Sequence, residues 1–87
     1  MTRDTYKLVK IIGNSEEIIT KSYYPMYTKM EMETLRDEFT KLINAGCLKA
    51  SIFIPIGGSS FRLTYAKGNK IVDVWYDLRV ETNYDIR

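Results

Sequence analysis

The chain has 87 residues, with 13 lysines and arginines against 11 acidic residues, one cysteine and no histidine. This length allows one domain, residues 1–87, and excludes a two-domain enzyme with a cleft between its halves. With 45% hydrophobic and 28% charged residues, the composition is typical of a folded globular protein.

Several kinds of chemistry are excluded by the residue types that the chain lacks. Without histidine there is no Ser-His-Asp or Cys-His catalysis and no histidine-ligated metal. The lone Cys47 cannot form an internal disulfide or a clustered zinc site, and we expect it to be a small buried hydrophobic residue. Asp73 and Asp77, four apart on an expected strand, would lie about 13 Å apart, too far to share a metal. We therefore expect no enzymatic activity, no metal and no cofactor.

Two strands are expected at the start of the chain. Tyr6 to Ile12 alternates between apolar and polar residues, and Gly13-Asn14 supplies a turn. Glu17 to Tyr24 is rich in isoleucine, threonine and tyrosine, which favours a second strand, and Pro25 ends it.

One amphipathic helix is expected at about residues 29–45. Thr28 and Glu31 have the spacing of a capping box, in which each side chain bonds the other residue's backbone N–H. Gly46 is suited to end the helix in the left-handed conformation. Apolar residues recur at helical spacing on one face, namely Met32, Leu35, Phe39, Leu42 and Ile43.

Three strand-like segments follow, joined by turns that contain glycine. Leu48 to Ile56 alternates with its isoleucines on one side, and residues 61–65 alternate in the same way. Ile71 to about Glu81 is the longest of the three. We expect residues 82–87 to form a loose tail.

The order strand-strand-helix-strand-strand-strand predicts an α+β fold. A mostly antiparallel sheet of about five strands would have the helix packed on one face. The pattern leaves the order of the strands within the sheet open.

One helix can cover only one face of such a sheet, so the second face must meet water, a partner or a copy of itself. In the last strand, Val72, Val74, Tyr76, Leu78 and Val80 form the core side. Trp75 and Arg79 then point outward, and Phe53 and Arg62 take the same outward positions in the third and fourth strands. Exposed aromatic residues near arginine are typical of a contact surface. The alternative is a cross-strand aromatic pair that only stabilises the sheet.

Residues 46–72 carry basic residues and no acidic one. The lysines of this stretch, which we expect to steer acidic partners, are Lys49, Lys67 and Lys70. A basic hairpin beside exposed aromatic rings is also typical of nucleic-acid binding. The small net charge of +2, and the acidic residues Asp73 and Asp77 on either side of Trp75, weaken that interpretation.

The segment from Lys21 to Lys29 contains Tyr23, Tyr24 and Tyr27 together with Met26. Such residues form a binding loop in some proteins, because a tyrosine ring packs while its hydroxyl stays hydrated. The other interpretation is that these residues fill the open end between sheet and helix. The small core of so short a chain favours this second interpretation.

The leading hypothesis is a small, non-enzymatic cytoplasmic protein that acts by protein–protein interaction. Met1 to Gly13 has no apolar signal segment, and no apolar stretch approaches the roughly 20 residues of a membrane span. Residues with AT-rich codons are abundant, as in proteins of low-GC bacteria and their phages. This bias suggests a phage- or mobile-element-encoded inhibitor of a host protein, of the anti-defence type. A second hypothesis is nucleic-acid binding through the outward face and the basic hairpin. A third is a homodimer whose sheets pack face to face through Trp75.

Overall fold

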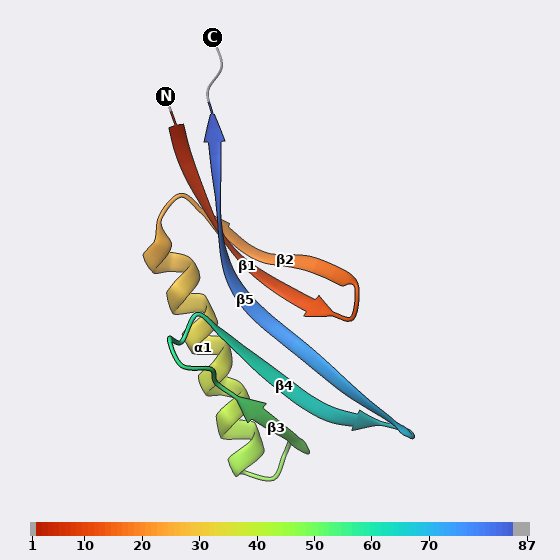
Figure 1. Ribbon diagram of the computed structural model, residues 1–87. Coiled ribbons are helices and arrows are strands. Elements are labelled where there is room, and N and C mark those ends of the chain that lie inside the picture. Colours follow the sequence, from red (N-terminus) through yellow and green to blue (C-terminus); the bar gives the residue numbers. More distant parts are fainter. Residues whose placement is uncertain (1, 85–87) are drawn as a thin grey trace.

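The computed structural model describes residues 2–84 as one five-stranded antiparallel sheet with one helix against it (Figure 1). The elements are β1 (Thr2–Ile12), β2 (Ser15–Ser22), α1 (Pro25–Asn44), β3 (Ala50–Phe53), β4 (Ser60–Lys67) and β5 (Lys70–Tyr84). The predicted α+β class and element order are confirmed. The strand order, which the sequence left open, is β2-β1-β5-β4-β3. Among these residues, no helix is both long and apolar enough to cross a membrane.

The first and last strands are neighbours in the sheet. β1 and β5 pair along the whole of β1, from Thr2 opposite Tyr84 to Ile12 opposite Val74. β2 adds to the free side of β1, and β4 and then β3 add to the free side of β5. The expected loose tail is wrong for residues 82–84, because they pair with β1; residues 85–87 of that tail lie outside the described residues.

The core lies between α1 and the sheet face that it covers. Its buried residues come from four elements and are Leu8, Met32, Phe61, Leu63, Val74 and Tyr76. The rings of Phe61 and Tyr76 stack with centroids 4.8 Å apart, and Phe39 of α1 meets Phe61 edge-on at 6.2 Å. The helical spacing and the alternation in β5 thus identified the core side correctly. Leu42 of α1 and Val80 of β5 are the exceptions, since both are exposed and neither belongs to the core cluster.

The helix begins four residues earlier than its sequence signal indicated. Pro25 is its first residue and Tyr24 is the N-cap, with no side-chain capping bond. The predicted capping box is wrong, because Thr28 lies inside the helix and its hydroxyl donates to the Pro25 carbonyl at 3.1 Å. Proline favours the first helical position, since its fixed φ suits a helix and its missing N–H would be unpaired there anyway.

The end of the helix follows the prediction. Gly46 has a φ of 75°. The Gly46 N–H donates to the Ile43 carbonyl and the Cys47 N–H donates to the Leu42 carbonyl, at 3.1 and 2.9 Å. These two bonds are the Schellman arrangement that a left-handed glycine permits. Cys47, expected to be buried, is exposed just after this turn.

The aromatic segment before and within the first helical turn does not fill the open end of the core. Tyr23, Tyr24, Met26 and Tyr27 are all exposed, so that interpretation is wrong. Because the helix starts at Pro25, its inward positions fall to Thr28 and Met32, both of which are buried. Met26 and Tyr27 are left on the outer side of α1.

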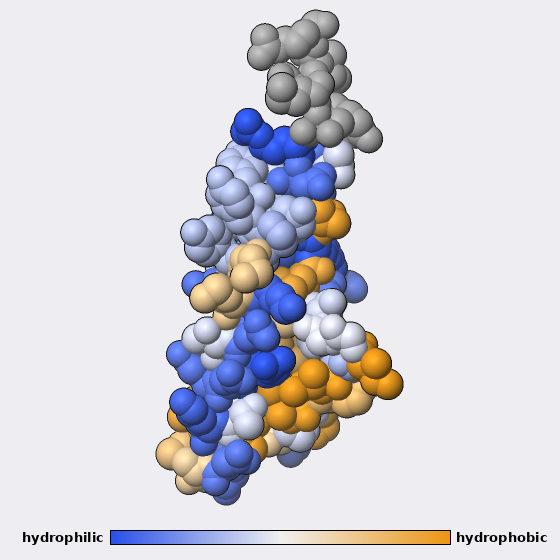
Figure 2. Space-filling view, turned by 90° about the vertical axis from the view of Figure 1, so that its left-hand side faces the viewer, coloured by the Kyte–Doolittle hydropathy of each residue, from blue (hydrophilic) through white to orange (hydrophobic). Residues whose placement is uncertain are grey.

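β3 is shorter than the alternation from Leu48 to Ile56 predicted. It ends at Phe53, and the chain then leaves the sheet through a loop in which Gly57 and Gly58 both have positive φ. Ile54 and Ile56, expected on the core side, are exposed. Figure 2, which views the helix side of the molecule, shows hydrophobic residues gathered in its lower part beside a largely hydrophilic surface.

Candidate protein-binding face

The outer face is the side of the sheet that α1 leaves uncovered. Strand register places Trp75 of β5 between Ile11 of β1 and Arg62 of β4, and places Phe53 of β3 opposite Arg62. These positions form one row across four strands. The structure therefore brings together three of the predicted contact residues, Phe53, Arg62 and Trp75, which we call the aromatic–arginine cluster.

The guanidinium of Arg62 packs against both aromatic rings of this cluster. Its Cζ atom is 5.0 Å from the ring centroid of Phe53 and 5.5 Å from that of Trp75. The two rings are perpendicular, with centroids 6.5 Å apart, and Phe53 is 49% exposed. A guanidinium close to a ring face is attracted by the negative charge of the ring's π-electrons. The two rings thus hold the guanidinium in a defined position.

The guanidinium of Arg62 has no polar partner in the part of the chain that the structure describes. Its Nε atom is buried without a hydrogen-bond partner. Within residues 2–84 no ion pair or side-chain hydrogen bond involves Arg62, so its terminal nitrogens depend on solvent. A buried donor without a partner is uncommon in proteins and marks this position for an explanation.

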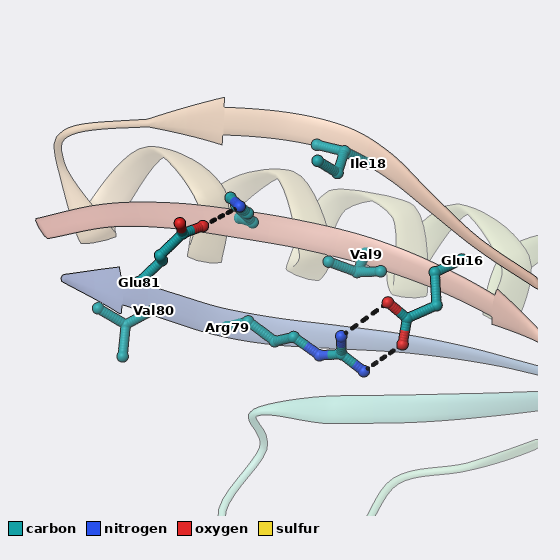
Figure 3. A pocket seen from close by; sticks show the side chains of 7 residues that line it. Val9, Glu16, Ile18, Arg79, Val80 and Glu81 are labelled. Atoms are coloured by element: carbon teal, nitrogen blue, oxygen red, sulfur yellow. Dashed lines mark hydrogen bonds and ion pairs between the residues drawn. The ribbon is translucent and has the colours of Figure 1, made fainter. Parts of the chain in front are cut away.

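Arg79, also predicted as a contact residue, is engaged by the chain itself. Its Nη1 and Nη2 atoms each lie 3.0 Å from a Glu16 carboxylate oxygen, and its Nε atom lies 3.4 Å from Asp77. The hydrogen bonds that Arg79 donates to Glu16, and then those it donates to Asp77, raise the pKa of Arg79 above its ordinary value. Glu16 belongs to β2 and Arg79 to β5, so the pair reaches across β1, where Val9 is only 3% exposed (Figure 3). Along β5, Arg79 is about 13 Å from Trp75.

A shallow hollow of about 340 Å³ lies on the outer face beside the Arg79–Glu16 pair (Figure 3). Val9, Ile18 and Val80 form its apolar lining. A second ion pair, between Lys7 and Glu81, lies at its other end. The hydrogen bond from Lys7, with its charge, lowers the pKa of Glu81.

The predicted steering lysines are not gathered on this face. Lys49 is exposed and directly precedes β3. Lys67 and Lys70 lie opposite each other at the end of the β4–β5 hairpin. Alternation along β5 puts Lys70 on the same side as Val72, which packs against the core, and so on the side away from Trp75.

The two acidic residues that flank Trp75 are also engaged within the chain. Asp73 accepts a hydrogen bond of 2.7 Å from the Thr64 hydroxyl, and Asp77 accepts the one from Arg79. Residues 2–84 contain no group of three or more side chains that could hold a metal ion.

Sequence reasoning missed the contribution of β1 and β2 to the outer face. Ile11, Glu16 and Ile18 join it because β1 lies next to β5 and β2 lies next to β1. Alternation placed Trp75 outward but could not show which strand lies beside it. Only the strand order reveals that Glu16 can reach Arg79.

Comparisons of the chain with protein-family models, with curated proteins and with solved structures found no match. The functional argument therefore depends on the geometry of the outer face.

Proposed function

We propose that the chain is a small non-enzymatic binding protein that attaches to another protein through its outer face. The observation that carries this proposal is the position of Arg62 against the rings of Phe53 and Trp75, without a carboxylate partner among residues 2–84. Tryptophan and arginine supply much of the binding energy at protein interfaces, because they combine a large packing area with polar groups. The ordering of their side chains here lowers the entropy that binding would cost.

The same geometry favours a protein over a nucleic acid as the partner. The guanidinium of Arg62 lies over both rings of the cluster, where a nucleic-acid base would have to stack. Asp73 beside Trp75 would repel phosphates, and Glu16 and Asp77 already occupy the guanidinium of Arg79. The lysines of the hairpin lie on the other side of the sheet.

A different protein also fits better than a second copy of this chain. A two-fold axis through the cluster would bring two Arg62 side chains together, and neither copy would supply a carboxylate there. Like charges buried against each other cost free energy that the ring contacts would have to offset.

Binding through the outer face would inhibit a partner by covering it, with no chemistry from this chain. Together with the bias toward AT-rich codons, this extends the proposal to a phage- or mobile-element-encoded inhibitor that covers a host protein in the cytoplasm.

Affinity capture with matched variants tests the proposal. The wild-type chain, Phe53→Ser, Trp75→Ala and the control Lys29→Ala would be immobilised and exposed to a lysate of a low-GC bacterium. Lys29 is exposed on α1, on the far side of the sheet from the cluster. We expect the wild type and Lys29→Ala to retain the same protein, and both cluster variants to retain at least tenfold less of it. We expect Phe53→Ser to remain folded even if Trp75→Ala does not, because Phe53 is half-exposed on an edge strand.

Equal retention by all four chains would place the interface elsewhere. A titration of Trp75 fluorescence with a mixed single-stranded oligonucleotide distinguishes nucleic-acid binding from protein binding. A saturable change that weakens steeply as salt increases would replace protein binding with nucleic-acid binding.

A further inference from the structure

We propose that the aromatic–arginine cluster receives an aspartate or glutamate side chain of the bound protein, while the hollow beside Arg79 receives an aliphatic side chain of the same segment. This inference rests on the proposed function and specifies the chemistry of the partner.

The first step concerns which cations of the outer face are neutralised by the chain. Lys7 is paired with Glu81, and Arg79 with Glu16 and Asp77. Among residues 2–84, Arg62 has no such carboxylate, although it lies in the same sheet face. Lys21, opposite Lys7, has none either, but it lies on β2, at the edge of the sheet far from the cluster. An incoming carboxylate would complete at Arg62 the arrangement that Glu16 already provides at Arg79.

The second step concerns the direction from which the carboxylate approaches. The Nε atom of Arg62 is buried, whereas its terminal nitrogens are not among the buried atoms that lack a partner. A carboxylate can therefore accept end-on from Nη1 and Nη2, with one oxygen on each nitrogen. Such paired, charge-assisted hydrogen bonds are among the strongest available to a side chain. The two rings exclude water from the sides of the guanidinium, which strengthens the attraction.

The third step concerns the rest of the partner segment. Val9, Ile18 and Val80 give the hollow an apolar lining, and the ion pairs beside it are already satisfied. An aliphatic side chain can enter without leaving a charge unpaired. Val9 pairs with Asp77 and Arg62 pairs with Trp75, so the two residues are two strands apart across the sheet and two residues apart along the strands. At ordinary sheet spacings this separation is about 12 Å. In an extended segment this distance corresponds to residues about four apart.

Selection from a library of displayed random 16-residue peptides tests this assignment. Peptides would be selected on the wild-type chain and then measured on Arg62→Gln, Ile18→Ser, Phe53→Ser and the control Lys29→Gln. We expect the selected peptides to share an acidic residue and an aliphatic residue near that spacing. Arg62→Gln, and replacement of the peptide's Glu by Gln, should each weaken binding about tenfold or more. Both changes together should cost little more than one alone, because they remove the same contact. Ile18→Ser should weaken binding of peptides with a large aliphatic residue, whereas Lys29→Gln should change nothing.

The outcomes separate this inference from the proposed function. Peptides that depend on Phe53 but bind Arg62→Gln as well as the wild type would overturn the carboxylate assignment and leave protein binding in place. A selection that enriches no peptide dependent on Phe53 would also overturn it, and capture from the lysate would then decide the proposed function alone. Binding of a single-stranded oligonucleotide that depends on Arg62 would assign the cluster to phosphate instead. Thermal unfolding of each variant shows whether it remains folded.

Discussion

Arg62 and Arg79 occupy the same sheet face but have opposite surroundings. Arg79 donates to two carboxylates of its own chain, and its bridge over β1 shields Val9 from solvent. Arg62 packs against two aromatic rings and has a buried nitrogen that finds no partner within residues 2–84. The first side chain therefore stabilises the sheet, whereas the second keeps hydrogen-bonding capacity that the described part of the chain does not use. Residue type and outward position were the same for both, so the sequence alone could not distinguish them.

The pair of Lys7 with Glu81 gives a pH-dependent test at this scale. Lys7 lowers the pKa of Glu81 from its ordinary value of 4.5, so Lys7→Met should raise that pKa toward the ordinary value. A carboxyl whose pKa is lower in the folded state stabilises the fold above the pKa of the unfolded state. That contribution disappears as pH falls through the folded value. The part of the stability difference between the wild type and Lys7→Met that depends on the charge of Glu81 should therefore be lost at strongly acidic pH.

Carboxyl chemical shifts measured by NMR across an acid titration would give the pKa directly. The control is Lys29→Met, which removes a lysine from α1 and should leave Glu81 unchanged. An unaltered Glu81 titration in Lys7→Met would show that this ion pair does not persist in solution.

At the scale of elements, α1 separates two methionines that the sequence places close together. Met32 is 1% exposed within the core, whereas Met30 is 57% exposed on the outer side of the helix. Met32→Ala should lower the free energy of unfolding by about 2–5 kcal/mol, because it leaves a cavity. Met30→Ala should change it by less than about 0.5 kcal/mol. Urea denaturation of the two variants measures both, and similar losses would mean that the helix is rotated from the position described.

The elements that sequence reasoning predicted well are those with a regular pattern that matches their burial. The alternation around Val74 and the helical spacing from Met32 to Ile43 each identify one covered face, which packing then confirms. Element ends were less predictable. Thr28 and Glu31 satisfy a capping pattern, but Pro25 starts the helix a turn earlier. The alternation through Ile56 continues after the strand has ended, because only Ala50 to Phe53 has β4 alongside.

The candidate site was predictable only in part for a related reason. Alternation assigns Phe53, Arg62 and Trp75 to one face, and the register brings them into one row. The Arg79–Glu16 pair and the hollow depend on β1 lying beside β5 and β2 beside β1. Such non-local neighbours leave no signal in local periodicity.

As a whole, the molecule is elongated, with extents of 53 × 25 × 20 Å and a Cα radius of gyration of 15.1 Å. A compact chain of this length would have a radius of gyration of roughly 12 Å. The difference arises because the β1–β5 ribbon extends past β2 and β4 at one end, while the β4–β5 hairpin extends at the other (Figure 1).

Small-angle X-ray scattering tests this shape together with the oligomeric state. We expect a radius of gyration nearer 15 than 12 Å. We also expect a scattering mass of one chain that does not change with concentration, because two Arg62 side chains would repel each other in a face-to-face dimer. The scattering mass could instead double as the concentration rises. If Trp75→Ala abolished that doubling, the result would favour the homodimer through Trp75 over a different protein partner.

The pairing of β1 with β5 at the centre of the sheet also determines when this chain can fold. A helix or a local hairpin can form as soon as its residues leave the ribosome, but β1 cannot pair with β5 until residues 74–84 have been synthesised. Contacts between the two ends of a chain also slow folding in solution, since a large loop must close before they form. A nascent chain would therefore lack the β1–β5 pairing until the residues of β5 have been synthesised, and the outer face would be incomplete until then.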